Sequence, residues 1–305
     1  MSSANISNKT KLKGEAMLCL AAIIWGTAFI FQKMGMEHIG PFTFTLFRFG
    51  IGALAMIPVM FFSDRVKRGK SEPIMSCSNR NLLLGGFIVG LANFGASALQ
   101  QIGIVYTTAG KAGFLTAMEM VMIPFFLVFL HRKVHGLTWL GVVIATIGMY
   151  LLCMRGGFSM AIGDLFCLGG ALGFAIQILI IDCFVERVDP IKLAFFEFAV
   201  TAGCSLIFTL ILEDIVMADI IACTVPLLYT AILEVCVAFS LQMIGQQYAP
   251  PAIATIIMSF ESVFAALSGV LFLHEVMTGR EVAGCIIMFA AFMIAQIPEM
   301  REDIQ

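Results

Sequence analysis

Long apolar runs, separated by short polar or turn-forming segments, dominate the chain. A helix needs about 20 mainly apolar residues to cross a bilayer. Ten runs come close to or reach that length, at residues 15–34, 42–62, 82–104, 110–130, 137–154, 162–182, 191–212, 220–240, 251–273 and 280–297. The pattern therefore predicts ten transmembrane helices joined by short loops.

Two features refine this pattern. The apolar run that follows the basic N-terminus, 16–34, is too long for the core of a signal peptide and lacks a small-residue cleavage site, so we expect a retained first helix. Pro124 and Pro226 fall inside the fourth and eighth spans and predict a kink in each.

The composition excludes a soluble globular domain. The chain is 60% hydrophobic and only 12% charged, whereas soluble domains carry about 25% charged residues. The net charge of −2 gives no basic surface for nucleic acid, so membrane lipid is the expected surroundings. The nine cysteines are scattered through apolar runs without a paired spacing, which implies neither disulfides nor a metal site, and no cofactor motif is present.

The distribution of Lys and Arg predicts the orientation. If the N-terminus is inside, thirteen of these residues fall in cytoplasmic segments and four in outside segments, while Arg48 lies within a span. Cytoplasmic loops carry the excess of positive charge. We therefore expect both termini in the cytoplasm, an even number of helices, and a multi-pass protein of a bacterial cytoplasmic membrane.

The two halves of the chain resemble each other. Residues 106–134 align without gaps on 248–276 at an offset of 142, which matches Glu119 with Glu261. Gly40-Pro41 and Phe47-Arg48-Phe49 match Asp189-Pro190 and Phe196-Glu197-Phe198 at an offset of 149. A unit of five helices repeated in one chain must insert its second copy upside down, and inverted repeats are a recurring plan of secondary transporters.

Two acidic residues lie near the middle of predicted spans. Glu119 and Glu261 are equivalent in the repeat, and ionisable groups at this depth are costly. One interpretation is a carboxylate pair that binds a proton or a cation in a central cavity. The other is a pair of helix-packing groups bonded to hydroxyls or backbone of neighbouring helices.

Other polar residues within the spans are weaker candidates. Arg48 and Glu197 should lie near opposite faces because of the inversion, and Glu234 at about the depth of Glu197; we expect gate or structural roles for all three. Amide and aromatic groups could line a cavity or bond neighbouring helices. These are Trp25, Gln32, Asn93, Gln100, Gln101, Gln177, Tyr229, Gln242 and Gln246.

Motifs of known enzymes are missing from the sequence. His274-Glu275 is not followed by the second histidine of a zinc protease motif, and no phosphate-binding loop or nucleophile elbow appears. A membrane-embedded enzyme, a channel or a receptor remain alternatives. A transporter without a nucleotide-binding domain would have to be driven by a gradient or be facilitative.

Several segments resemble the drug/metabolite transporter superfamily, in its group of ten-helix permeases with EamA domains. The segments are Trp25-Gly-Thr-Ala-Phe29, Thr107–Thr116, Ile181-Asp182, Val188-Asp189-Pro190, Leu241–Tyr248 and, most specifically, Ser259–Glu275. The resemblance covers two domains, 14–153 and 160–297, between a cytoplasmic tail at 1–13 and another at 298–305.

The resemblance implies an all-α membrane protein with two inverted five-helix repeats around a central cavity. It also implies alternating-access transport of small metabolites such as amino acids, often outward, with helices five and ten at the periphery. Glu261 fits the family pattern, whereas Glu119 stands where the group more often has a neutral residue, which suggests an amine-bearing solute. Proton coupling is a further expectation, and the sequence gives no signal for or against a homo-oligomer.

Overall fold

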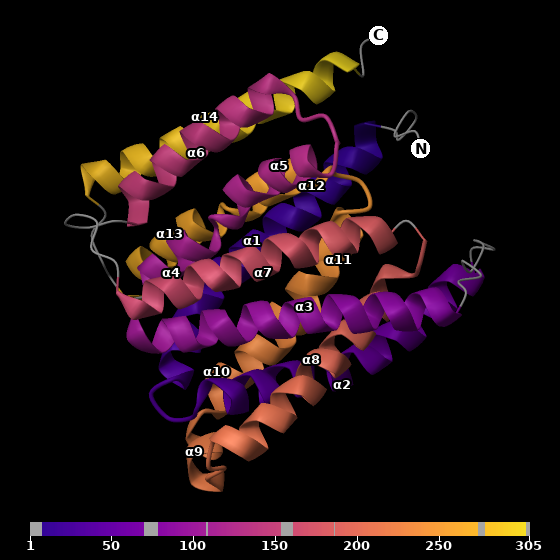
Figure 1. Cartoon of the computed structure of the whole chain (residues 1–305), viewed down its shortest axis with the longest axis vertical. Coiled ribbons are helices and arrows are strands. Elements are labelled where there is room, and N and C mark those ends of the chain that lie inside the picture. Colours follow the sequence, from indigo (N-terminus) through magenta and orange to yellow (C-terminus); the bar gives the residue numbers. More distant parts are fainter. Residues whose placement is uncertain are drawn as a thin grey trace.

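The computed structural model describes residues 8–69, 79–107, 109–153, 161–185, 187–273 and 278–302. Within these residues every regular element is a helix (Figure 1). The first half contains α1 (Asn8–Gly35), α2 (Pro41–Gly69), α3 (Asn79–Tyr106), α4 (Ala109–Thr116), α5 (Glu119–Phe129) and α6 (Gly136–Cys153). The second half contains α7 (Ile162–Phe184), α8 (Pro190–Leu212), α9 (Met217–Ala222), α10 (Thr224–Tyr229), the π-helix η1 (Thr230–Phe239), α11 (Ser240–Gly245), α12 (Pro251–Met258), α13 (Glu261–Leu273) and α14 (Gly279–Glu302).

Seven helical segments of the described chain are long and apolar enough to cross a membrane. They are Thr10–Gly35, Pro41–Arg65, Arg80–Tyr106, Ala112–Phe129, Ile162–Phe184, Pro190–Leu212 and Thr224–Gly245. Shorter apolar helices at Gly136–Leu152 and Pro251–Ala265 accompany them. The protein is therefore a multi-pass, all-helical membrane protein. Each predicted span except the eighth coincides with one helix or with two consecutive helices.

Two of the predicted spans are broken in the middle. The fourth consists of α4 and α5, separated by a turn at Ala117-Met118. The ninth consists of α12 and α13, separated by a turn at Ser259-Phe260. The two turns are 142 residues apart, which is the offset of the sequence repeat, so both spans break at equivalent positions.

The eighth span lies further along the chain than predicted. Residues 220–222 belong to the separate short helix α9, and the continuous helical segment runs from Thr224 to Gly245. Pro226 therefore sits in the first turn of α10, where the backbone N–H groups have no partner within the helix, and not in the middle of the span as predicted. Glu234 lies six residues before the end of the predicted span, 220–240, but in the middle of the observed segment, within η1.

Local chemistry explains where several helices begin. Pro41, Pro190 and Pro251 each occupy the first residue of a helix, for which their fixed φ is suited. The Asp189 carboxylate caps α8 by accepting hydrogen bonds from the backbone N–H groups of Ile191 and Lys192. Gly40 stands at the position equivalent to Asp189, and the cap of α2 comes instead from Glu213 at the end of α8.

The helices form one bundle whose two termini emerge at the same end (Figure 1). α6 and α14 pack on each other along one edge, and α3 packs between α7 and α8. Small residues permit these close approaches. A Cβ added at Gly90 would lie 2.6 Å from the Cβ of Val200, and one at Gly173 would lie 2.8 Å from the Cβ of Ala96.

The contacts also give the relative directions of the packed helices. α3 runs parallel to α8, because Gly86 meets Phe196 and Gly90 meets Val200. α2 runs antiparallel to α8, with Phe42 stacked on Phe208 at one end and Asp64 paired with Lys192 at the other. α6 and α14 are also antiparallel.

Candidate functional site

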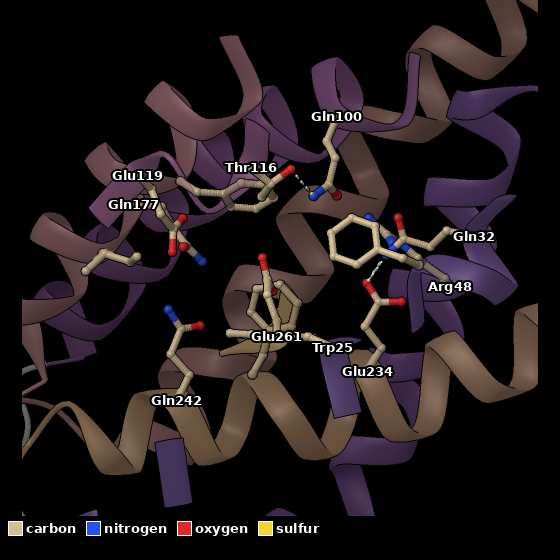
Figure 2. Close-up of a pocket in the computed structure, with 14 residues that line it drawn as sticks. Trp25, Gln32, Arg48, Gln100, Thr116, Glu119, Gln177, Glu234, Gln242 and Glu261 are labelled. Atoms are coloured by element: carbon tan, nitrogen blue, oxygen red, sulfur yellow. Dashed lines mark hydrogen bonds and ion pairs between the residues drawn. The ribbon is translucent and has the colours of Figure 1, made fainter. Parts of the chain in front are cut away.

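A cavity lies between the two halves of the chain, with about 480 Å³ of empty space that includes its opening to the surroundings. Helices from both halves line it: α1 to α5 from the first half and α7, η1, α11 and α13 from the second. The peripheral helices α6 and α14 contribute no lining residue. The fourteen lining residues, drawn in Figure 2, are Trp25, Phe29, Gln32, Arg48, Gln100, Thr116, Glu119, Phe174, Gln177, Ile178, Glu234, Phe239, Gln242 and Glu261.

Glu119 and Glu261 are the first residues after the two helix breaks. Glu119 begins α5 and Glu261 begins α13. Both carboxyl groups line the cavity, and they are close enough to interact electrostatically (Figure 2). Within the described chain no side chain donates a hydrogen bond to either group. The cavity therefore contains two carboxyl groups that have no hydrogen-bond donor among the side chains that the structure describes.

A hydrogen-bonded triad forms the other end of the cavity (Figure 2). Arg48 Nη1 donates to Glu234 Oε1 at 2.8 Å, and Gln32 Nε2 donates to the same oxygen at 2.8 Å. The Arg48 guanidinium also lies over the Phe49 ring, 4.9 Å from its centroid, which is a cation–π geometry. This cation is thus already neutralised by Glu234, and it does not balance Glu119 and Glu261.

Several buried polar atoms of the lining have no partner in the described protein. The donors are Trp25 Nε1 and Arg48 Nε, and the acceptors are Gln32 Oε1, Glu234 Oε2 and Gln242 Oε1. Buried polar groups are nearly always hydrogen-bonded, to protein or to something bound. A polar ligand or water in the cavity would satisfy both the free donors and the free acceptors.

An apolar wall completes the cavity. Trp25 meets Phe239 edge to face, with ring centroids 5.2 Å apart. Phe29, Phe174 and Ile178 extend this wall from α1 and α7. The lining therefore combines a few placed polar groups with aromatic surface, which is the composition of small-molecule sites.

Hydrogen bonds link the lining to residues behind it. Gln100 Nε2 donates to Thr116 Oγ1 at 3.0 Å within the lining. Gln177 Nε2 donates to Glu197 Oε1 at 2.6 Å, and Glu197 itself is completely buried behind the cavity.

The structure brings together most of the residues that the sequence singled out. Trp25, Gln32, Gln100, Glu119, Gln177, Gln242 and Glu261 line the cavity, together with Arg48 and Glu234. Asn93, Tyr229, Gln246, Gln101 and Glu197 do not line it. Asn93 bonds Thr201 on α8 at 3.1 Å. Tyr229 stacks on Phe31 and hydrogen-bonds the Thr27 hydroxyl, while Gln246 and Gln101 are buried between helices.

One predicted relationship differs in the structure. Glu234 was expected at about the depth of Glu197, but it pairs with Arg48. The reason is the shifted boundary of the eighth span, which places Glu234 in the middle of the bundle. Arg48 and Glu234 are thus cavity-lining as well as structural, and no ion pair joins Arg48 to Glu197 among the described residues.

The apolar part of the lining was not predicted from the sequence. Phe29, Phe174, Ile178 and Phe239, and the hydroxyl of Thr116, were not singled out. Helical spacing carried a usable signal, because Trp25, Phe29 and Gln32 recur at intervals of four and three residues and share one face of α1. No group of three or more His, Cys, Asp or Glu residues that could hold a metal ion occurs in the described part of the chain.

Comparisons with known proteins extend this picture. The model of the EamA-like transporter family matches residues 12–154 and 161–296. An uncharacterized transporter of Archaeoglobus fulgidus is 30% identical over 292 residues, covering 94% of this chain and 87% of the relative. The uncharacterized transporter YoaV of Bacillus subtilis is 22% identical over 272 residues, covering 87% of this chain and 90% of the relative.

A solved crystal structure shares the fold. It superposes with a TM-score of 0.73 at 16% identity and covers 94% of this chain and 98% of its own. Two family matches, which together take up nearly the whole chain, confirm the resemblance seen in the sequence motifs. The chain belongs to the EamA-like transporter family of the drug/metabolite transporter superfamily.

Proposed function

We propose that this chain is a secondary transporter that moves a small amine-bearing solute, such as an amino acid, across the cytoplasmic membrane by alternating access. The solute binds in the cavity with its ammonium group between Glu119 and Glu261. The absence of a described cationic partner for these two carboxyl groups supports a cation as their ligand, because buried charges are paired.

One observation carries most weight: both acids stand at the break of a discontinuous helix. Non-helical backbone at membrane depth is tolerated where it lines a cavity, and discontinuous helices form the substrate and ion sites of many transporters. The turns at Ala117-Met118 and Ser259-Phe260 each lead directly into one of the acids. The repeat thus places two equivalent breaks and two equivalent carboxyl groups around one cavity.

We assign the chain to two inverted five-helix units, residues 14–153 and 160–297, which together supply ten spans. The antiparallel packing of α2 on α8 and of α6 on α14 supports this assignment, since each pair combines equivalent helices of the two halves. The excess of Lys and Arg in alternate loops supports a cytoplasmic location of both termini.

The remaining lining suits a solute with an apolar body and a polar second group. The rings of Trp25 and Phe239 offer apolar surface, and Trp25 Nε1 offers a free donor to a carbonyl or carboxylate oxygen. In this proposal the solute is transported out of the cell, and the proton is the coupling ion. The family resemblance supports outward transport, and the two carboxyl groups in the cavity, which could bind a proton, support proton coupling.

Binding is tested by the fluorescence of Trp25. The chain has two tryptophans, so Trp139→Phe leaves Trp25 as the only reporter. Purified protein is titrated with n-butylamine, L-leucine and butyrate, which share an apolar chain and differ in charge. We expect the amine and the amino acid to change the fluorescence, and butyrate to have no effect.

Variants then locate the amine. Glu119→Gln and Glu261→Gln should each weaken amine binding at least tenfold, whereas Glu37→Gln, at an exposed site outside the cavity, should not. Equal binding of amine and butyrate, or unchanged binding in both cavity variants, would exclude the carboxyl pair as the ammonium site. Counterflow in proteoliposomes, followed by uptake into inside-out vesicles, tests transport and its direction.

A further inference from the structure

Glu197 is a buried acid that the proposed solute site does not use. It lies on α8 with no exposed surface. Its Oε1 accepts the 2.6 Å hydrogen bond from Gln177 Nε2, while its Oε2 has no partner. No positively charged side chain of the described chain forms an ion pair with it.

The equivalent position in the first half makes this lack of a cation informative. Arg48 and Glu197 occupy the same place in the repeat, between two phenylalanines. Arg48 is balanced by Glu234, which also accepts a hydrogen bond from Gln32 of α1. Glu197 likewise accepts a hydrogen bond from a glutamine, Gln177 of α7, but none of the described cationic side chains forms an ion pair with it.

An ionised carboxylate in this position would be poorly stabilised. One amide donor offsets only part of the cost of removing the charge from water, and buried ions in membrane spans are otherwise paired. A neutral carboxylic acid needs no cation. In such an acid Oε1, which accepts from Gln177, would be the carbonyl oxygen, and the unpaired Oε2 would be the hydroxyl oxygen.

The described contacts of Glu197 connect it to the cavity through Gln177. On α3, Gly90 packs directly against the Glu197 backbone, and the Asn93–Thr201 bond at 3.1 Å joins α3 and α8 one turn further on. Thr201 Oγ1 lies 2.9 Å from the Glu197 backbone carbonyl. Gln177 of α7 both lines the cavity and contacts the carboxyl group.

We infer that Glu197 is a second proton-binding site, separate from the solute-binding carboxyl groups, and that it exchanges its proton with the cavity past the side chain of Gln177. When Gln177 moves aside, water from the cavity reaches the carboxyl group, takes the proton as hydronium and leaves a carboxylate. A proton arriving from the cavity restores the acid. This step rests on the proposed function, because it supplies the ion that drives the solute.

Any test must distinguish the signal of Glu197 from the signals of other charged groups nearby. The cavity beyond Gln177 contains Glu119, Glu261, Glu234 and Arg48. On α2 and α8 the pair Asp64–Lys192 lies towards the helix ends, and α11 presents the neutral Gln242.

Infrared spectroscopy of the purified full-length protein in lipid nanodiscs tests the inference without any solute. The C=O band of a protonated carboxylic acid is distinct from the carboxylate bands. At neutral pH we expect Glu197→Gln to remove one acid equivalent of the protonated band. Glu37→Gln, at an exposed site, should instead remove carboxylate absorption. If Glu197→Gln removes carboxylate absorption, the site is ionised and the inference is wrong.

The rate of hydrogen–deuterium exchange tests the route. After transfer to D₂O the Glu197 band shifts as its proton is replaced. Gln177→Ala, which opens the path, should speed this shift at least tenfold relative to Gln177→Leu, which fills it with apolar atoms. Equal rates in the two variants would rule out the route past Gln177. Both variants keep Glu197, so the test stands even if Glu197→Gln fails to fold, and neither readout depends on amine binding.

Discussion

Arg48 Nη1 and Glu234 Oε1 lie 2.8 Å apart, and the two side chains are almost entirely buried. The pair joins α2 of the first half to η1 of the second. Removing one partner leaves an uncompensated buried charge, which typically costs about 3–5 kcal/mol, whereas replacing both can be nearly neutral. We therefore expect Arg48→Met and Glu234→Gln each to lower the free energy of unfolding by several kcal/mol, and the double variant to recover part of that loss.

The half-exposed pair Asp64–Lys192 provides the comparison, with a separation of 3.2 Å and side chains 26% and 28% exposed. Such a pair contributes about 0–1 kcal/mol, so Lys192→Gln should change stability little. Denaturant titration of the four proteins in mixed micelles measures the difference. Equal losses for Arg48→Met and Lys192→Gln would contradict a special role of the buried pair.

Gly26 has no side chain, which allows α1 to pack closely against the first turn of α13. A Cβ at Gly26 would lie 2.7 Å from Ala265 N and 2.7 Å from Phe264 Cβ, so α1 or α13 would have to move. Overpacking of this kind costs about 1–3 kcal/mol. Because Glu261 begins α13, we expect Gly26→Ala to destabilise the protein and also to weaken amine binding in the Trp25 fluorescence titration.

Gly95 on α3 is the matched control, since a Cβ there would meet nothing within 4 Å. Alanine is favoured over glycine in a helix by roughly 0.5–1 kcal/mol. Gly95→Ala should therefore leave stability unchanged or slightly raised, with normal binding. Similar behaviour of the two alanine variants would show that the close approach at Gly26 does not position the acid.

These relationships differ in how far the sequence could predict them. The helices and the two candidate acids follow from hydropathy and from the repeat. The breaks before Glu119 and Glu261 do not, because Ala117-Met118 and Ser259-Phe260 include neither proline nor glycine. A break in a continuous apolar run depends on tertiary packing, which leaves no local signal.

The partner of Arg48 was missed for a related reason. Ile220 and Ile221 are as apolar as the span that follows, so nothing in hydropathy separates α9 from the segment Thr224–Gly245. An error of a few residues at this boundary shifted the predicted position of Glu234 along the bundle axis. At 1.5 Å per residue, such a shift is enough to separate or join a hydrogen-bonded pair.

The start of α2 depends on an acid from the other half. Glu213 Oε1 accepts from Phe42 N at 2.9 Å, and Oε2 accepts from Thr43 N and Thr43 Oγ1 at 2.7 Å each. Loss of such a cap costs about 0.5–2 kcal/mol. We expect Glu213→Ala to increase amide hydrogen exchange in the first turn of α2 roughly tenfold, because about 1.4 kcal/mol corresponds to a factor of ten.

Asp214 is the neighbouring acid and is exposed, so Asp214→Ala controls for the loss of one negative charge. Mass spectrometry of the peptide that contains Phe42 and Thr43 reports the exchange. Faster exchange in both variants would point to a general electrostatic effect, and slow exchange in both would show that the cap contributes little.

The orientation in the membrane can be tested with single cysteines. In a variant without native cysteines, Ser71→Cys reports the basic segment 63–80, and Glu37→Cys reports the opposite end of α2, where Glu37 is exposed. The Lys and Arg bias predicts a cytoplasmic location for the first segment. An impermeant maleimide should therefore label Glu37→Cys in intact cells, and Ser71→Cys only after permeabilisation. The reverse pattern would mean that the termini face outward, and equal labelling of both in intact cells would contradict a membrane crossing by α2.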